Sequence, residues 1–332
     1  MTLRVTPRLF SGRVNPTWTL DDAAAVDVLR ELHLSPGVVD GVGAPPCRLG
    51  FSGLQIDVGS DLLAAETGLP STFFIGTGRT SHESRAQEIA ARLVETMPQH
   101  RSGETLLDGA SDEGLRSLLL EEIAEVSTLQ SGSPLTTVTE QELSVELSQS
   151  PDPSGSLDAS CTVESGEYKP GFWNDGSTVQ LSNNCYSYAA NRRIDKFGIP
   201  GKGGGRMVRP PFTKENVVAA MLADGLKPHG SCLPETEKPR YLIALVIAPL
   251  KPGDPNYNDF HFFRNSVQSL SNQTYFWSHK PGQCPVINID NSGRIITNVE
   301  RANRGKYTIF GGYFYLSKSS KIDGIKVGGF TD

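Results

Sequence analysis

The sequence predicts an α+β protein with two compact parts joined by a polar segment. Its 332 residues are enough for two domains with separate cores, and its apolar and charged fractions, 37% and 20%, are ordinary for a globular protein. Three amphipathic helical patterns and two strand-like runs lie in residues 1–127, and three short strand-like runs lie in residues 161–332. We therefore expect a small α+β domain at residues 1–127 and a second domain at residues 161–332.

The elements of the first part follow from periodicity and capping. Residues 2–10 alternate as a strand, and residues 48–58 read as another. Three helical patterns carry an apolar stripe, the clearest of them behind a capping box of Thr80 and Glu83. The three helices are expected to begin at Thr19, Thr80 and Ser111. The expected partner of this domain is a protein or a cell wall.

A turn-rich segment, Phe10 to Trp18, follows the first predicted strand. Arg13, Asn15 and Trp18 are grouped in it as in a loop that contacts a ligand. The alternative is a capping turn whose Trp18 covers the core of the domain. Both interpretations stay open at this point.

Residues 128–160 differ in composition from the parts on either side. Ser, Thr, Gln, Pro and acidic residues dominate, and the run SQSPDPSGS lies within the segment. Such a composition buries little apolar surface, so we expect a linker or a cleavable spacer.

One cysteine stands where a loop is predicted to become a helix. The run NCYSYAANRR places Cys185 after residues that cap helix starts, and residues 186–196 lack Gly and Pro. In a first helical turn, unpaired backbone N–H groups and the helix dipole favour a thiolate. We therefore expect Cys185 to be the nucleophile of an acyl transfer, with its N–H and the side chain of Asn183 or Asn184 holding the oxyanion. The alternative is a small buried apolar residue.

Three predicted strands follow the cysteine. The run YLIALVIA at residues 241–248 is short, apolar and β-branched, and it precedes two further strands at residues 259–267 and 274–279. His261 begins the second of the three strands, and His279 ends the third. A hairpin of these strands would put both histidines at one rim of a sheet.

The cysteine run resembles the nucleophile signature of the CHAP branch of the NlpC/P60-like superfamily. In that signature Cys is followed three residues later by an aromatic residue, then by a small residue, and later by Arg. The matching positions here are Cys185, Tyr188, Ala189 and Arg192, and His261 matches the family's histidine by its place. The resemblance covers the C-terminal half alone.

The resemblance implies a papain-like domain with a helix-borne cysteine packed on an antiparallel sheet. It implies a cysteine amidase or peptidase that acts through a thioester, without metal or organic cofactor, on peptidoglycan peptides or a glutathionyl-polyamine-like amide. Papain-like scaffolds also serve as deamidases and transferases. Joined to an N-terminal domain, such an enzyme would suit a targeted hydrolase, an effector toxin or an inhibited proenzyme.

The residue that orients His261 departs from the family pattern. A Glu, Asp or Asn is usual on the following strand, whereas this chain has Trp277, Ser278, His279 and Lys280 there. We expect His279 to be the third catalytic residue, with Asn288 and Asp290 as alternatives on a next strand. Tyr188 and Trp277 are the further candidates for contact with a substrate.

Two functions of other classes stay possible. Four side chains could close a zinc tetrahedron and stabilise a binding module, although they include no Cys-x-x-Cys pair. They are Cys232, His261, His279 and Cys284. The same fold could also serve as a catalytically silent binding domain.

Charge and cysteine usage limit partners and location. A net charge of −6 without a concentrated basic stripe argues against nucleic-acid binding. The N-terminus lacks a long apolar region, and no run is as long as a membrane span, so we expect cytoplasmic synthesis, with export by another route still possible. Five cysteines without paired spacing are unlike a disulfide framework. The expected ligand is a peptide or amide substrate.

Overall fold

The computed structural model divides into two compact units. It describes residues 2–40, 47–59, 67–97, 112–126, 162–230, 232–250, 258–269, 274–323 and 325–326. Unit 1 comprises residues 1–10 and 14–133, and unit 2 comprises residues 11–13 and 134–332. The expected linker at residues 128–160 lies outside the described residues. A segment of three residues near the N-terminus is thus grouped with the second unit.

Unit 1 contains a four-stranded antiparallel sheet. The strands, in the order β2-β1-β3-β4 across the sheet, are Trp18–Leu20, Leu3–Pro7, Leu54–Val58 and Thr72–Ile75. Buried and less buried residues alternate along β3, as expected of a strand with one face on a core. The two predicted strands of this unit are both present, and each is shorter than its pattern.

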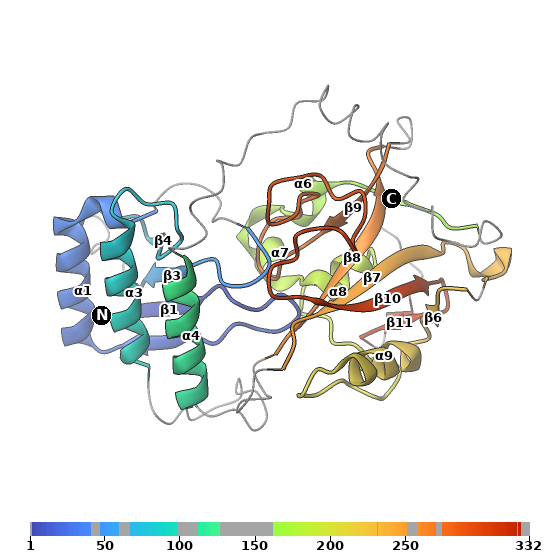
Figure 1. Cartoon of the computed structure of the whole chain (residues 1–332), viewed down its shortest axis with the longest axis horizontal. Helices are drawn as coiled ribbons and strands as arrows, with labels where there is room; N and C mark the ends of the chain where they lie inside the picture. The colour runs from blue at the N-terminus through green and yellow to red at the C-terminus, as the bar shows by residue number, and fades with distance from the viewer. Residues whose placement is uncertain are drawn as a thin grey trace. The chain divides into compact units, whose positions relative to one another are not determined.

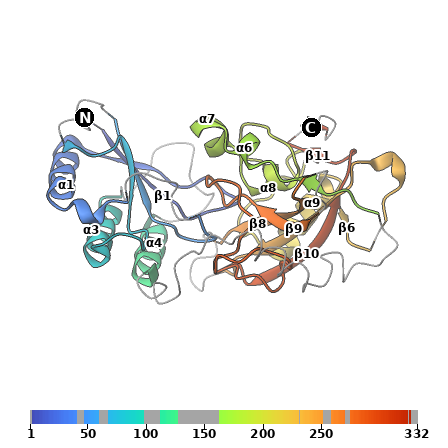
Figure 2. The same ribbon diagram turned by 90° about the horizontal axis from the view of Figure 1, so that it is seen from above.

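The helices of unit 1 gather on one face of this sheet (Figure 1, Figure 2). They are α1 (Asp22–Leu34), α3 (Glu83–Glu95) and α4 (Asp112–Val126), with a 3₁₀ turn, η1 (Pro36–Val38), after α1. The cap of α1 is Asp21, whose side chain accepts from the N–H of Ala24, so the helix begins later than expected. The predicted capping box is present only in part: the carboxylate of Glu83 accepts from the N–H and the hydroxyl of Thr80, but α3 begins at Glu83 itself, after His82, so this helix also begins later than expected.

The turn before β2 caps the core of unit 1. The side-chain oxygen of Asn15 accepts from the N–H groups of Leu9 and Phe10, which closes the turn. Trp18 is buried, and its indole N–H donates to the hydroxyl of Thr96. Trp18 therefore covers the core, as the capping interpretation predicts.

Unit 2 is built on a six-stranded, mainly antiparallel sheet. Its strands run in the order β5-β8-β7-β10-β6, and β9 also pairs with β8. They are β5 (Gly166–Glu167), β6 (Lys227–Pro228), β7 (Tyr241–Ile247), β8 (Phe260–Val267), β9 (Tyr275–His279) and β10 (Ile309–Leu316). A separate pair, β11 (Lys321–Ile322) and β12 (Ile325–Lys326), follows β10. The three predicted strands correspond to β7, β8 and β9.

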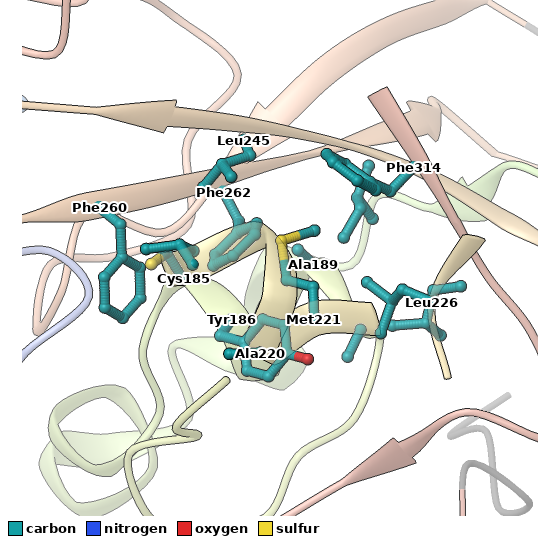
Figure 3. Close-up of a cluster of buried hydrophobic side chains, with 14 of the residues drawn as sticks. Cys185, Tyr186, Ala189, Ala220, Met221, Leu226, Leu245, Phe260, Phe262 and Phe314 are labelled. Carbon is teal, nitrogen blue, oxygen red and sulfur yellow. The ribbon is translucent and has the colours of Figure 1, made fainter. Parts of the chain in front are cut away.

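Short helices accompany this sheet. They are α6 (Pro170–Trp173), α7 (Gly176–Ser182), α8 (Cys185–Ala189) and α9 (Lys214–Ala223), with a 3₁₀ turn, η3 (Glu235–Glu237). Figure 3 shows the core that α8 and α9 share with the strands. Each unit is thus a mixture of helices and antiparallel sheet, which confirms the α+β class.

Two predicted elements of unit 2 are wrong in extent. The helix expected to run to residue 196 ends at Ala189, and Asn191 has a φ of 51°, which the α-helix does not allow. Residues 286–290 do not form a regular strand but only isolated bridges, one between His279 and Ile287 and one between Ile289 and Ile295. Among the described helices, none is long and apolar enough to cross a membrane.

The glycine-rich loop after α8 is held by a buried carboxylate at the end of α9. Asp224 accepts from the N–H groups of Gly201 and Gly204 and from the hydroxyl of Tyr186. A side chain on Gly204 would collide with the carbonyl of Ala223, so the loop lies directly on the end of the helix. These hydrogen bonds, called the Asp224 clamp below, connect α8, the loop and the end of α9.

Removal of this clamp should destabilise the protein. We expect Asp224→Ala to lower the free energy of unfolding by about 2–4 kcal/mol, because three donors would lose a buried acceptor. Urea unfolding followed by circular dichroism measures the change. The control is Glu215→Ala in the exposed first turn of the same helix, where we expect a much smaller loss because solvent screens this carboxylate. Equal losses in the two variants would contradict the role of the clamp.

Candidate functional site

Cys185 begins α8 and lies in the core of unit 2. Asn184 caps the helix, and its side-chain oxygen accepts from the N–H of Ser187. The side chain of Cys185 is fully buried, and it lies beside Phe260 in Figure 3. The predicted position at a helix start is therefore present, and the burial is that of the alternative, a small buried residue.

The surroundings of Cys185 favour a neutral thiol. Burial raises the pKa of Cys185, and the nearby carboxylate of Asp259 raises it further. Hydrogen bonds with the backbone of Phe262 and the hydroxyl of Ser11, and the charge of Lys280, act in the opposite direction but are outweighed. The expected thiolate is thus wrong for this state of the protein, since α8 has only five residues and little dipole to set against desolvation.

The two histidines form a hydrogen-bonded chain that ends on a backbone carbonyl. The distance between Nε2 of His261 and Nδ1 of His279 is 2.9 Å, and Nε2 of His279 lies 2.9 Å from the carbonyl oxygen of Ile289. A carbonyl oxygen only accepts, so Nε2 of His279 carries a proton. In a neutral His279, Nδ1 is then the acceptor, and Nε2 of His261 donates to it. The lone pair of His261 is therefore on Nδ1.

Both histidines are neutral in this arrangement. Burial, followed by the neighbouring His279, lowers the pKa of His261 well below its ordinary value. Burial lowers the pKa of His279 to about 4, and the bond to the Ile289 carbonyl offsets only part of that effect. Neutral rings are what the tautomer assignment requires, so the geometry and the pKa directions agree.

The hydroxyl of Ser11 occupies the position that the lone pair of His261 faces. Oγ of Ser11 lies 2.6 Å from Nδ1 of His261, to which it donates. The same oxygen accepts from the N–H of Gly282 at 3.1 Å and is hydrogen bonded to the Cys185 thiol. One donor and two acceptor positions are all that a hydroxyl has. Ser11 thus bridges Cys185 and His261, and the donor and both acceptor positions of its hydroxyl are occupied.

Asp259 holds the backbone around Ser11. Its carboxylate accepts from the N–H of Ser11 at 2.6 Å, from the N–H of Gly12 and from the hydroxyl of Tyr307 at 2.5 Å. Asp259 is fully buried, although its sequence position directly before β8 is typical of a solvated residue at a strand start. Burial raises the pKa of Asp259, while the bond from Tyr307, first among several, limits the rise.

Lys280 is a buried residue whose charge acts on Cys185. Nζ of Lys280 donates to the carbonyl oxygens of Gln180, Gly282 and Cys284 at 2.6, 2.7 and 2.9 Å. These three bonds satisfy the three donors of an ammonium group. Lys280 therefore ties the turn after β9 to α7 and adds a fixed positive charge near Cys185.

Of the two asparagines expected to hold an oxyanion, the structure brings one to the site. Nδ2 of Asn184 donates to the carbonyl of Gly12 and to the carbonyl of Gly198, both at 2.9 Å. Asn183 instead binds Asp195 and the backbone around it. Asn183 therefore shapes the chain after α8, while Asn184 already holds a peptide carbonyl.

Tyr188 and Trp277 lie in packed surroundings. The ring of Tyr188 packs against Trp173 and beneath the guanidinium of Arg264, which lies 4.2 Å from its centroid. The ring of Trp277 packs on Tyr313. Both side chains are buried, and they show packing rather than a surface for substrate.

The alternatives for the third residue do not meet His261 within the described part of the chain. Both ring nitrogens of His261 are taken, by Ser11 and by His279. Asp290 accepts from the backbone N–H groups of its own loop, and Asn288 pairs through its carbonyl with Ile296. His279 is the residue that the structure places beside His261.

The zinc alternative is wrong for the described cysteines. Cys232 and Cys284 are in disulfides, as is Cys47, and a disulfide sulfur cannot supply a thiolate ligand. Among the described residues, no group of three or more His, Cys, Asp or Glu side chains could hold a metal ion. The expectation of free cysteines fails because disulfides depend on distance in space rather than on spacing in the sequence.

Sequence reasoning missed Ser11, Asp259 and Lys280. Asp259 stands two residues before His261, so strand periodicity places both side chains on one face, and this signal was available. Ser11 is 250 residues from His261, and no local pattern connects them. A buried lysine that donates to backbone carbonyls has no sequence signature.

Comparisons with known proteins identify one relationship. No family model matches the chain, and no solved structure matches it. The chain is 36% identical over 161 residues to the "Insoluble matrix shell protein 1" of Ruditapes philippinarum. The matched residues are 48% of this chain and 97% of that relative, so nearly the whole relative is represented. The chain therefore belongs to the family of the insoluble matrix shell protein 1.

Proposed function

We propose that the protein is a cysteine-dependent amidase or peptidase with Cys185 as nucleophile and His261 as base. The tautomers of the two histidines carry this proposal. They put the basic lone pair of His261 on the nitrogen that faces the bridge to Cys185, and they leave His279 to orient the ring. An imidazole held by a second group is the arrangement that activates a thiol.

The reaction follows from these positions. Nδ1 of His261 takes the thiol proton, and the sulfur of Cys185 attacks the carbonyl carbon of an amide. The C–N bond then breaks, and the imidazolium gives its proton to the leaving amine. Water, deprotonated by His261, attacks the thioester, and the C–S bond breaks to release the acid and restore the thiol. Asn184, which donates to a peptide carbonyl in the structure, would hold the oxyanion.

The order of elements supports a papain-like domain of the CHAP-like branch. A cysteine at the start of a helix contacts a strand whose second residue is a histidine, and the next strand ends with the residue proposed to orient it. This is the layout that the resemblance implies. The substrate would be a peptide or a similar amide, and the partner of unit 1 would be a protein or a cell wall.

The disulfide-bonded cysteines indicate the compartment in which the protein acts. Disulfide-bonded Cys47, Cys232 and Cys284 are typical of an oxidising compartment. We therefore propose that the protein acts after export, the route that the expectation of cytoplasmic synthesis left open.

Substitutions in the site should separate the roles of its members. Cys185→Ala and His261→Ala should abolish hydrolysis, because each removes a group that forms or breaks bonds. His279→Ala should lower the rate by about 10- to 10⁴-fold, since the base remains but loses its orientation. His279→Gln should recover part of this loss, because a Gln amide can accept from His261 and donate to Ile289. Amine release from a panel of peptide amides measures the rates.

The matched control is His229→Ala, which removes a histidine of unit 2 that packs on Tyr315. We expect it to keep the rate of the unchanged protein. If Cys185→Ala keeps full activity, the proposed nucleophile is wrong. If His279→Ala is as active as His229→Ala, the orienting role is wrong.

The neutral state of His279 should make stability depend on pH. Its pKa is about 4 in the folded protein and 6.5 when exposed, so the unfolded chain binds more protons between these values. The contribution of His279 is complete above pH 6.5 and is lost as the pH falls to 4, by about 3 kcal/mol in total. Asp259, whose pKa is raised, acts with the opposite sign, so the comparison must be between variants.

Urea unfolding of the unchanged protein and of His279→Gln between pH 7 and pH 4 tests this dependence. The free energy of unfolding of the variant should fall less steeply, by about 1.4 kcal/mol per pH unit below pH 6. His229→Gln should keep the slope of the unchanged protein. Parallel slopes for His279→Gln and the unchanged protein would show that His279 is not buried as a neutral group.

A second candidate function is that of a non-catalytic matrix component. The name of the relative describes an insoluble matrix protein of a shell, and the complete burial of Cys185 is compatible with a site that performs no reaction. The two functions differ in what Cys185→Ala does. If the protein is a matrix component, Cys185→Ala should enter an insoluble fraction as the unchanged protein does. Neither the unchanged protein nor any variant should then hydrolyse the amides of the panel.

A further inference from the structure

The segment Ser11–Arg13 is embedded in unit 2 at the Cys185–His261 site. All three residues are grouped with unit 2, although Phe10 and Val14 on either side belong to unit 1. Ser11 and Arg13 are 2% and 6% exposed, so the segment is part of the interior. The hydroxyl of Ser11 stands between the thiol and the base that the proposed reaction brings together.

The backbone of the segment is bound as a peptide ligand would be. The N–H groups of Ser11 and Gly12 donate to Asp259, and the carbonyl of Gly12 accepts from Nδ2 of Asn184. Asn184 is the side chain that the proposed mechanism assigns to the oxyanion. Recognition of successive N–H and C=O groups does not depend on sequence and would serve any peptide in this place.

The position of Gly12 accepts no side chain. A Cβ on Gly12 would lie 2.4 Å from the ring of Phe260 and 2.7 Å from its carbonyl oxygen. The carbonyl oxygen belongs to the backbone of β8 and cannot turn aside as a side chain can. This place in the site is therefore specific for glycine.

The position of Arg13 recognises a cation. Its guanidinium donates to the carbonyl of Asn258 at 2.7 Å and lies 4.8 Å from the centroid of Phe212. Its charge also acts on Asp259, which is buried beside it. The residue after glycine is thus recognised by the charge of its guanidinium and by the contact of that planar group with the ring of Phe212.

We propose that Ser11–Arg13 is a tethered peptide ligand, and that the site binds peptides in which a small hydroxyl residue precedes Gly-Arg. The inference rests on the proposed function for the role of Cys185, and it adds the substrate class. In the structure the chain fills its own site. A peptide of this class reaches Cys185 once the tethered segment has left.

Alkylation of Cys185 by iodoacetamide in the full-length chain tests the proposal. Gly12→Ala should displace the segment, so Cys185 should be alkylated at least about tenfold faster than in the unchanged protein. Gly171→Ala is the matched control, because a Cβ on Gly171 meets nothing within 4 Å. Arg13→Ala is a second displacing variant that adds no clash. Mass spectrometry of the Cys185 peptide under non-reducing conditions gives the rates, and circular dichroism confirms folding.

A free peptide completes the test. Acetyl-Phe-Ser-Gly-Arg-amide should slow the alkylation of Cys185 in Gly12→Ala and in Arg13→Ala, while acetyl-Phe-Ser-Ala-Arg-amide should not. In the unchanged protein neither peptide should change the alkylation rate of Cys185, because the tethered segment competes for the site at a high effective concentration.

The proposal is overturned if folded Gly12→Ala and Arg13→Ala are alkylated no faster than Gly171→Ala. It is overturned as well if the glycine peptide protects no better than the alanine peptide. Because these readouts are alkylation rates, they do not depend on hydrolysis. Faster alkylation and selective protection without any hydrolysis would support the tethered ligand and reject the proposed enzyme.

Discussion

A backbone carbonyl, that of Ile289, determines the chemistry of the whole site. Because this oxygen only accepts, Nε2 of His279 carries the proton of that ring. Nδ1 of His279 is then an acceptor, so Nε2 of His261 carries the proton of the second ring. The lone pair of His261 is therefore on Nδ1, which faces Ser11. Each step depends on neutral rings, and burial supplies that condition by lowering both pKa values. The loop that carries Ile289 is therefore connected to Cys185 through three side chains, those of His279, His261 and Ser11.

The site is also an example of polar groups buried at high density. Asp259, Lys280, His261 and His279 are all inside unit 2, and each has hydrogen-bond partners. Groups of this kind are costly to bury unless they are satisfied, so the backbone segments that satisfy them must be held in place. Backbone N–H and C=O groups supply many of these partners. The precision of the site thus derives from the turns around it as much as from its side chains.

Local patterns predicted the elements of this fold better than its contacts. Strands β7, β8 and β9 are short apolar runs whose extent follows from composition, and the cap at Asn184 follows from residue type. The length of α8 was not predictable, because Asn183 binds the chain at Ile194 and Asp195 and thereby prevents the helix from continuing. His279 was placed beside His261 by strand pairing alone. Ser11 required a contact across 250 residues, for which periodicity contains no information.

The long separation between Ser11 and its partners has a consequence for biosynthesis. Asp259 and His261 leave the ribosome about 250 residues after Ser11. At common rates of translation the delay is roughly 10 to 50 s, which is long compared with the folding of most small domains. During that time Ser11 and its neighbours Gly12 and Arg13 cannot yet make their contacts in unit 2. Folding of unit 2 therefore includes an event that joins Ser11 to residues synthesised about 250 positions later, and a stop in translation before Asp259 would leave that event undone.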